Sequence, residues 1–303
     1  MINYDPHRWR DTIFAIKGSV LQKVAPRVLL FSAWAGLLSW VNGEFYHLEM
    51  PAVAHTLVGV ALGLLLVFRT NASYDRFWEG RRQWGSLINA SRNLARGASA
   101  LVRGEPNLSN AIRAWTTAFA YALMHRLRNG GGLGHAAQLV PNDEAHIAAE
   151  SGNAPLACAA RISLAIADAR RSGALTDYEQ MLMDTQVASL VDVGGACDRI
   201  HKTPLPFAYV IHLRTALILY CGSLPFALMR DFGGIGEVVV TTLVSFVLLG
   251  IEEIGVEIED PFGTDANDLP LEGFCHTIER DMQRDLLGKK DEANFVNNPT
   301  SSR

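Results

Sequence analysis

The chain has 303 residues and a formal net charge of -4, which argues against a general nucleic-acid binder because such proteins present a basic surface. Its hydrophobic content of 49% and mean hydropathy of +0.11 lie between those of a soluble enzyme and a pure bundle of membrane helices. The four cysteines are scattered without a CxxC spacing, which argues against a zinc ribbon or a disulfide framework.

Four apolar segments have the length that a membrane-spanning helix needs. Such a helix requires about 20 mostly apolar residues to cross the hydrocarbon layer. The segments end at ordinary helix-breaking residues, such as Asn42-Gly43 and Gly233-Gly234. The predicted spans are residues 24–41, 51–68, 205–229 and 235–251.

Lysine and arginine are distributed unevenly around the first two predicted spans. Arg8, Arg10 and Lys17 precede the first span, whereas residues 42–50, which follow it, contain neither lysine nor arginine. Arginines return after the second span, beginning with Arg69. Because positive segments favour the cytoplasmic side, both termini are expected in the cytoplasm. The charged N-terminal segment has no apolar core, so no cleaved secretory signal is expected.

The polar remainder is expected to form a helical cytosolic part from residues 70–203 and 252–288. The helix of the second span continues beyond Thr70 without a break signal. The tail 289–303 has the composition of a disordered segment, and residues 1–288 are expected to form a single domain. The predicted cytosolic helices are 70–102, 107–129, 155–172 and 176–200.

A soluble helical protein with four buried helices is the simplest alternative. It gives similar apolar runs, and the polar residues His212, Arg214 and Glu237 inside the predicted spans weaken an argument from hydropathy alone. The charge asymmetry of the loops favours the membrane protein.

Three motifs occur in the order and at the spacing of a known family. Residues 68–81 read FRTNASYDRFWEGR and are followed by Trp84-Gly85. Residues 203–207 read TPLPF before the third span, and residues 260–263 read DPFG. Together with the four spans, these motifs closely resemble the bestrophins, and the first is similar to the signature of the bacterial branch. The resemblance covers nearly the whole chain.

The resemblance implies an all-α, four-span homopentamer with one central pore and a helical cytosolic domain, in the inner membrane of a bacterium. It implies an ion channel for small monovalent ions. Chloride is the expected ion because the animal members are anion channels, although bacterial relatives do not share one charge preference. The alternatives are a cation-selective channel of the same fold and a transporter or scaffold without channel activity. The expected partners are further copies of the chain, the lipid bilayer and the permeating ions, with no nucleic acid.

The same resemblance places the narrow neck of the pore. Aligning Arg76-Phe77-Trp78 with the Arg-Trp-Trp of the family puts the neck at Val60, Leu64 and Phe68. These residues are four apart, so they stack on one face of a helix. Five copies form three apolar rings, which can close a pore by dewetting. An apolar stripe of this kind also suits packing against a neighbouring helix or lipid.

Further positions follow from the first motif and its surroundings. The resemblance also implies a lower constriction in the vestibule, and counting back from Pro206 in the second motif places it at Tyr178. Gly59 and Gly63 form a GxxxG pattern, which allows another helix to approach closely. The signature residues below the neck either steer ions or hold the helices together through hydrogen bonds, and we favour the second role. These residues are Arg69, Asn71, Tyr74, Arg76, Trp78 and Glu79.

An acidic segment near residue 260 raises the question of calcium. The resemblance implies a calcium site there, since animal members are opened by calcium at an acidic segment after their own Asn-Pro-Phe-Gly motif. This chain has fewer acids, whereas calcium takes six to eight oxygen ligands, and loops with Asp and Asn commonly form turns. We expect no cofactor, and the alternative is a calcium site at Asp260, Asp265 and Asp268.

Acidic residues also cluster at the end of the fourth span. Facing the pore they would favour cations, and facing away they would form a solvated helix end. The cluster consists of Glu252, Glu253, Glu257, Glu259 and Asp260. No GxSxG, HExxH or P-loop motif is present, so an enzyme is not predicted.

Overall fold

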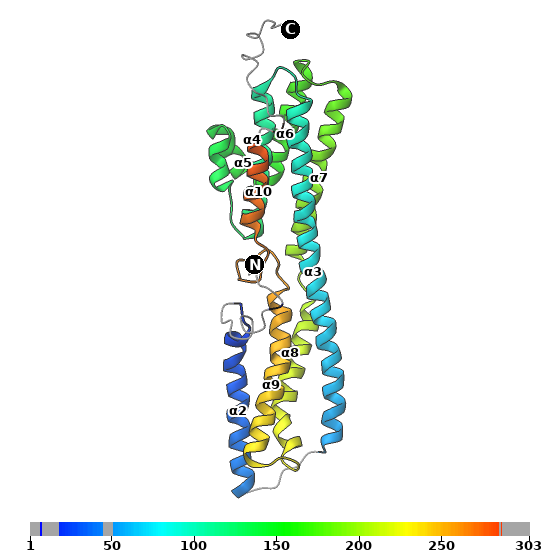
Figure 1. The fold of residues 1–303 in the computed structure, drawn as a ribbon. Helices are drawn as coiled ribbons and strands as arrows, with labels where there is room; N and C mark the ends of the chain where they lie inside the picture. The colour runs from blue at the N-terminus through cyan, green and yellow to red at the C-terminus, as the bar shows by residue number, and fades with distance from the viewer. Residues whose placement is uncertain (1–6, 8–17, 45–50, 285, 287–303) are drawn as a thin grey trace, which may run out of the picture. The chain divides into compact units, whose positions relative to one another are not determined.

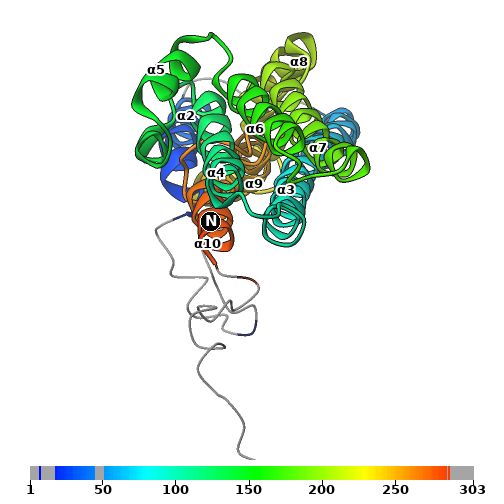
Figure 2. The same ribbon diagram turned by 90° about the horizontal axis from the view of Figure 1, so that it is seen from above.

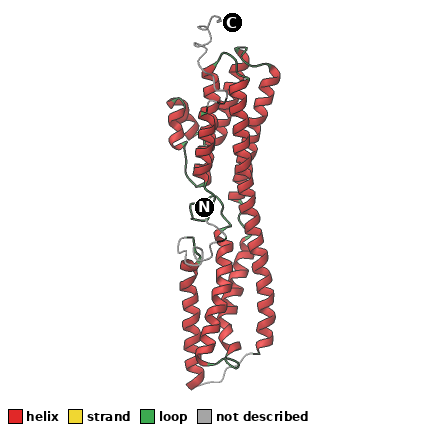
Figure 3. Cartoon of the chain, in the orientation of Figure 1, coloured by secondary structure: helices red, strands yellow, loops and turns green. Residues whose placement is uncertain are grey.

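The computed structural model describes residues 7, 18–44, 51–284 and 286, and the side chains of 42–44 are not among the described atoms. Every regular element within these ranges is helical (Figures 1 and 3), which confirms the all-α prediction. Arg8, Arg10, Lys17 and the tail 289–303 lie outside the described residues. The elements are α2 Leu21–Glu44, α3 Ala52–Ala100, α4 Pro106–Leu127, η1 Gly134–Leu139, α5 Asn142–Glu150, α6 Ala154–Arg171, α7 Asp177–Lys202, α8 Phe207–Leu228, α9 Gly234–Glu257 and α10 Leu271–Gln283.

The chain divides into two compact units, and α3 contributes residues to both. The first unit comprises Met1–Gly80 and Lys202–Leu269, and the second comprises Arg81–His201 and Pro270–Arg303. As predicted, α3 continues without interruption from the second apolar segment into the polar sequence after it.

The first unit contains four helices that are long and apolar enough to cross a membrane: Leu21–Val41, Ala52–Ala100, Phe207–Leu228 and Gly234–Glu257. Only 22% of the most apolar stretch of each helix is buried. A core helix of a soluble protein buries its apolar side chains, so the soluble alternative does not account for these helices. Their exposed side chains include Leu29, Val60, Leu219 and Leu243.

Within this unit, α2 packs along α9, and α9 also contacts α8 (Figure 1). The buried side of α3 meets α8 through Leu62, Leu66, Leu213 and Leu217. The Tyr209 hydroxyl adds a hydrogen bond of 2.7 Å to the Leu65 carbonyl oxygen. These contacts fix which side of α3 remains exposed.

The two glycines of the GxxxG pattern have different surroundings. A Cβ atom on Gly59 would lie 2.5 Å from the Tyr220 hydroxyl oxygen and 3.1 Å from the ring carbon that bears it, whereas a Cβ on Gly63 would meet nothing within 4 Å. Gly59 therefore permits the close approach of α8, and Gly63 has no such contact within the described chain.

Gly59→Ala is therefore expected to lower the free energy of unfolding by about 1–3 kcal/mol, the usual cost of overpacking. Gly63→Ala is the matched control and should be neutral or slightly stabilising because alanine favours helix. Thermal unfolding in detergent, followed by circular dichroism, compares the two variants. Equal midpoints would show that Tyr220 moves aside without cost.

The second unit is built around α4, which lies beside α6 and α10 (Figure 2). Nearly every side chain of α4 from Trp115 to Met124 is buried. The helix ends where Asn129 adopts a positive φ of 55° and the Gly130 N–H donates to the His125 carbonyl oxygen at 2.8 Å, a left-handed helix ending. The predicted helices α4, α6 and α7 lie within two residues of their expected limits, whereas η1, α5 and α10 were not predicted.

Candidate pore-lining face of helix α3

One face of α3 in the first unit is apolar and exposed. The exposed fractions of Val60, Leu64 and Phe68 are 70%, 55% and 57%, and their spacing of four keeps them on one side of the helix. Leu62 and Leu66 point to the opposite side and are buried. The three predicted neck residues therefore share a surface that the rest of the described chain does not cover.

The same face continues into polar residues within the first unit. Asn71, Asp75 and Trp78 are exposed, and Asp75 follows Phe68 by seven residues, two helical turns. Sequence reasoning missed Asp75, although this spacing was available to it. The face therefore combines an apolar stretch with one carboxylate. Of the other signature residues, Tyr74 is exposed and Glu79 is half-buried.

Arg69 points away from this face into the core of the first unit. Its side chain is 1% exposed, and its Nη2 atom lies 3.4 Å from Glu259 Oε2 and 3.7 Å from Glu252 Oε1. A Cβ on Gly255 would lie 3.2 Å from Arg69 Nε, so the glycine makes room for the guanidinium. Arg69 therefore joins α3 to the end of α9 and does not line the exposed face.

Arg76 makes a second connection of the same kind. Its Nε donates to the Glu259 carbonyl oxygen at 3.1 Å, and its Nη1 donates to the Thr203 carbonyl oxygen. Because charge-assisted hydrogen bonds are among the stronger ones, these contacts hold the chain before α8 and the chain after α9 against α3. Both signature arginines thus have structural partners.

The acidic residues at the end of α9 are paired inside the first unit. Arg27 Nη1 lies 2.9 Å from Glu253 Oε2 and Arg214 Nε lies 2.9 Å from Glu252 Oε1. Both glutamates are buried. Together with Arg69 and Glu259, these residues form a group of three arginines and three glutamates. Its members are Arg27, Arg69, Arg214, Glu252, Glu253 and Glu259. Glu257 and Asp260 of the predicted acidic cluster are not part of this arrangement.

Lys23 of α2 lies between an acid of the loop after α9 and Glu257, the last residue of α9. Lys23 Nζ lies 3.0 Å from Asp265 Oδ2 and 3.8 Å from Glu257 Oε1. Asp268 Oδ2 accepts a hydrogen bond of 2.6 Å from the Asp265 N–H, and Asp260 Oδ1 accepts one of 3.2 Å from the Phe262 N–H. No group of three or more metal-ligating residues of His, Cys, Asp or Glu type converges anywhere in the described chain.

Asp268 is a buried acid of this loop. Burial raises the pKa of its carboxyl group to about 6, a hydrogen bond from the Asp265 backbone opposes this effect, and the negative charges of Asp265, Asp260 and Glu257 add to it. The hydrogen bonds from backbone N–H groups to Asp260 and Asp268 give the loop the pattern of a turn that is closed by aspartate side chains.

Tyr178, the predicted lower constriction, lies in the first turn of α7 in the second unit. Its side chain is 83% exposed. The predicted neck residues belong to the first unit. Its assignment to a constriction stays a prediction.

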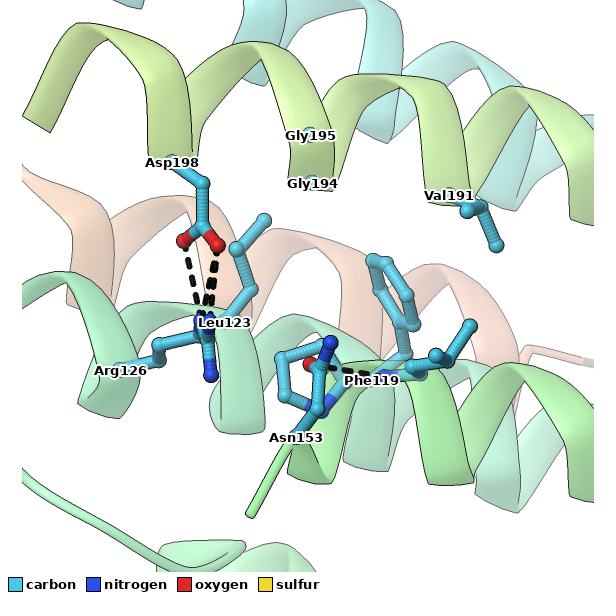
Figure 4. A pocket seen from close by; sticks show the side chains of 10 residues that line it. Phe119, Leu123, Arg126, Asn153, Val191, Gly194, Gly195 and Asp198 are labelled. Carbon is cyan, nitrogen blue, oxygen red and sulfur yellow. Dashed lines mark hydrogen bonds and ion pairs between the residues drawn. The ribbon is translucent and has the colours of Figure 1, made fainter. Parts of the chain in front are cut away.

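The second unit also contains a hollow of about 140 Å³ between α4, α6 and α7 (Figure 4). Arg126 lies at its edge and donates from Nε and Nη2 to the Asp198 carboxylate at 2.8–3.1 Å. The Asp198 hydrogen bond raises the pKa of Arg126, against a smaller lowering by burial. Arg126 and Asp198 thus neutralise each other, and the rest of the lining is mainly apolar. We therefore do not treat the hollow as a candidate ligand site. Its lining includes Phe119, Leu123, Asn153, Val191, Gly194 and Gly195.

Comparison with known proteins agrees over almost the whole chain. Residues 1–284 match the family described as Bacterial/Fungal Bestrophin protein. The chain is 38% identical over 287 residues to a voltage-dependent anion channel-forming protein of Synechocystis sp., covering 93% of this chain and 92% of the relative. It is 32% identical over 299 residues to the voltage-dependent anion channel-forming protein YneE of Escherichia coli (strain K12), covering 97% and 95%.

Solved structures give the same result. A bacterial bestrophin homologue from Klebsiella pneumoniae superimposes with a TM-score of 0.81 at 32% sequence identity, covering 86% of this chain and 97% of that chain. The chain therefore belongs to the family of bacterial and fungal bestrophins.

Proposed function

We propose that this protein is an anion channel whose pore is lined by the exposed face of α3. The observation that carries the proposal is the apolar stripe of Val60, Leu64 and Phe68. Each of these side chains is more than half exposed. The relatives named above are anion channel-forming proteins, and their names and family indicate a channel rather than an enzyme. The pairing of Glu252, Glu253 and Glu259 with arginines supports anion conduction because it reduces the predicted source of cation preference.

The proposed assembly is a homopentamer in which five α3 helices surround one axis. Each ring of apolar side chains removes water from a passing ion without replacing it, so a narrow neck opens and closes by wetting and dewetting. The four candidate spans then cross the inner membrane with both termini in the cytoplasm, an orientation that the arginines after the second span favour. Tyr178 is the proposed second constriction in the same pore.

Chloride release from liposomes tests this function. Purified protein in liposomes loaded with chloride is expected to release chloride after dilution into impermeant anions, and native mass spectrometry is expected to give five times the chain mass of 33.1 kDa. Intact pentamers without any ion flux would contradict the channel and favour a transporter or scaffold. Flux from another oligomer would contradict only the pentamer.

A cation-selective channel of the same fold is the second candidate, and Asp75 is the observation that favours it. This exposed carboxylate lies two turns beyond Phe68 on the same face. Five copies would form a ring of negative charge next to the neck, and rings of acidic side chains attract cations.

Asp75→Asn tests whether this carboxylate lies in the pore, as the second candidate requires. Removing the charge is expected to shift the reversal potential toward the chloride value, since fewer cations then gather at the neck. Asp143→Asn is the matched control because this exposed carboxylate lies on α5, and it should leave the reversal potential unchanged. An identical potential in wild type and Asp75→Asn would place Asp75 outside the pore.

We also propose that the acidic loop works without calcium because Lys23 supplies the positive charge there. About 1 mM calcium, which saturates many calcium sites, should leave the thermal midpoint of the wild-type protein unchanged. In Lys23→Met, which frees Asp265 and Glu257, calcium should raise the midpoint more than in the wild type. A calcium-specific rise in the wild type, absent with magnesium, would restore the site at Asp260, Asp265 and Asp268.

A further inference from the structure

The buried face of α9 carries a line of polar side chains inside a candidate membrane span. Glu237, Thr241 and Ser245 follow one another at intervals of four, so they lie on one side of the helix. Their exposed fractions are 1%, 0% and 0%. We call these three residues the polar file. An ionisable side chain at such a place is costly and is commonly functional.

Within the described chain, one carboxylate oxygen and both hydroxyls of the polar file are buried without a nitrogen or oxygen partner: Glu237 Oε1, Thr241 Oγ1 and Ser245 Oγ. Ser245 has only a hydrogen bond with the Cys221 thiol, which is a weak partner. Thr242, on the adjacent side of α9, shows the usual alternative. Its hydroxyl donates to the Val238 carbonyl oxygen at 2.7 Å and lies 2.7 Å from Ser32 Oγ.

Unpaired groups also occur toward the other end of α9. Arg69 Nε and Nη1 are buried without a partner, although Nη2 lies near Glu252 and Glu259. The polar file therefore offers a carboxylate oxygen and two hydroxyls, and Arg69, near the other end of α9, offers N–H donors. A cation satisfies only the oxygens, and an anion accepts from the hydroxyls and N–H groups but not from the carboxylate, whereas water both donates and accepts and so suits every one of these groups.

We propose that ordered water molecules bind along the polar file and that Glu237 is a proton-binding site in contact with them. A water molecule in a protein typically makes about three hydrogen bonds to buried polar groups, so waters supply the missing partners of the carboxylate and both hydroxyls. Leaving these groups unpaired would instead cost the full desolvation penalty of each one.

The charged groups that meet α9 from neighbouring helices are distant from Glu237. Arg27 of α2, Arg69 of α3 and Arg214 of α8 all contact α9 at or beyond Glu252, 15 residues and thus about 22 Å along the helix. These three arginines therefore contribute little to proton binding at Glu237. At the α8–α9 end of these helices, the titratable and charged side chains of the described chain are His55, Tyr220, Cys221, Arg230 and Asp231.

Infrared spectroscopy of the full-length protein in lipid nanodiscs tests the proposal. Spectra from acid to alkaline pH are expected to contain a protonated-carboxyl C=O band that is absent in Glu237→Gln and that shifts when D₂O replaces H₂O. Glu272→Gln is the control, because Glu272 is an exposed carboxylate on α10, and it should keep the band. Neither measurement requires ion conduction, so the result is independent of the channel proposal.

Two outcomes would overturn the proposal. The first is identical carboxyl spectra of wild type and Glu237→Gln at every pH, and the second is a Glu237 band that does not shift after prolonged exposure to D₂O. If Glu237→Gln does not fold, Thr241→Val replaces the file's central hydroxyl by a methyl group of the same shape. It should slow the exchange of the band about tenfold, the factor that one lost hydrogen bond represents; an unchanged exchange rate would count equally against the water file.

Discussion

Arg69→Met is expected to destabilise the folded protein by about 3–5 kcal/mol, the cost of removing one partner from a buried ion pair. The variant leaves Glu252 and Glu259 next to an apolar side chain where the guanidinium now lies 3.4–3.7 Å away. Because native proteins are stable by only about 5–15 kcal/mol, this loss is a large part of the total and should lower the yield of folded protein. The measurement is the yield of folded protein in detergent, together with its thermal midpoint.

Arg103→Met is the control for this prediction. Arg103 pairs with Glu179 at 2.6 Å in the second unit, but its side chain is 61% exposed. Exposed ion pairs contribute about 0–1 kcal/mol, so this variant should retain nearly the wild-type midpoint. If both variants were equally stable, Arg69 would not be the structural connection between α3 and α9 that its contacts indicate.

Leu64→Ala and Phe68→Ala are expected to raise the open probability and the conductance of the channel severalfold. Each substitution removes an apolar side chain from every subunit, so the neck becomes wider and stays wet for longer. Single-channel recording in planar bilayers measures both quantities. Phe68→Ala should have the larger effect because it removes the larger side chain.

A similarly exposed apolar residue on another helix provides the comparison. Leu219 on α8 is 67% exposed, and Leu219→Ala should leave gating unchanged if that surface faces lipid. Unchanged gating in both Leu64→Ala and Phe68→Ala would place the constriction elsewhere and assign the α3 stripe to packing between helices.

The main helices could be predicted because their signals are local. The uninterrupted run beyond Thr70 predicted the single helix α3, and proline at the start of α4 and α6 marks a first helical turn. The prediction missed α10, although its buried Leu271, Cys275, Ile278 and Met282 recur with the period of an amphipathic helix. It also missed α5, whose nine residues are too short to give a clear periodic signal.

The candidate site could be predicted only in part. The spacing of Val60, Leu64 and Phe68 gives their common face, but burial of Arg69 depends on Glu252 and Glu259, which lie more than 180 residues away in the chain. Likewise, Gly59 and Gly63 are equivalent in sequence, and only the position of Tyr220 distinguishes them. Long-range contacts of this kind leave no local signal.

The reversal potential of the purified protein in a planar bilayer under a KCl gradient tests the central claim most directly. An anion channel gives a potential near the equilibrium value for chloride, which is the predicted result because Glu252 and Glu253 at the end of α9 are paired with arginines. A potential near the potassium value would contradict anion selectivity and identify Asp75 as the first residue to test. Absence of current from intact oligomers would contradict the channel itself.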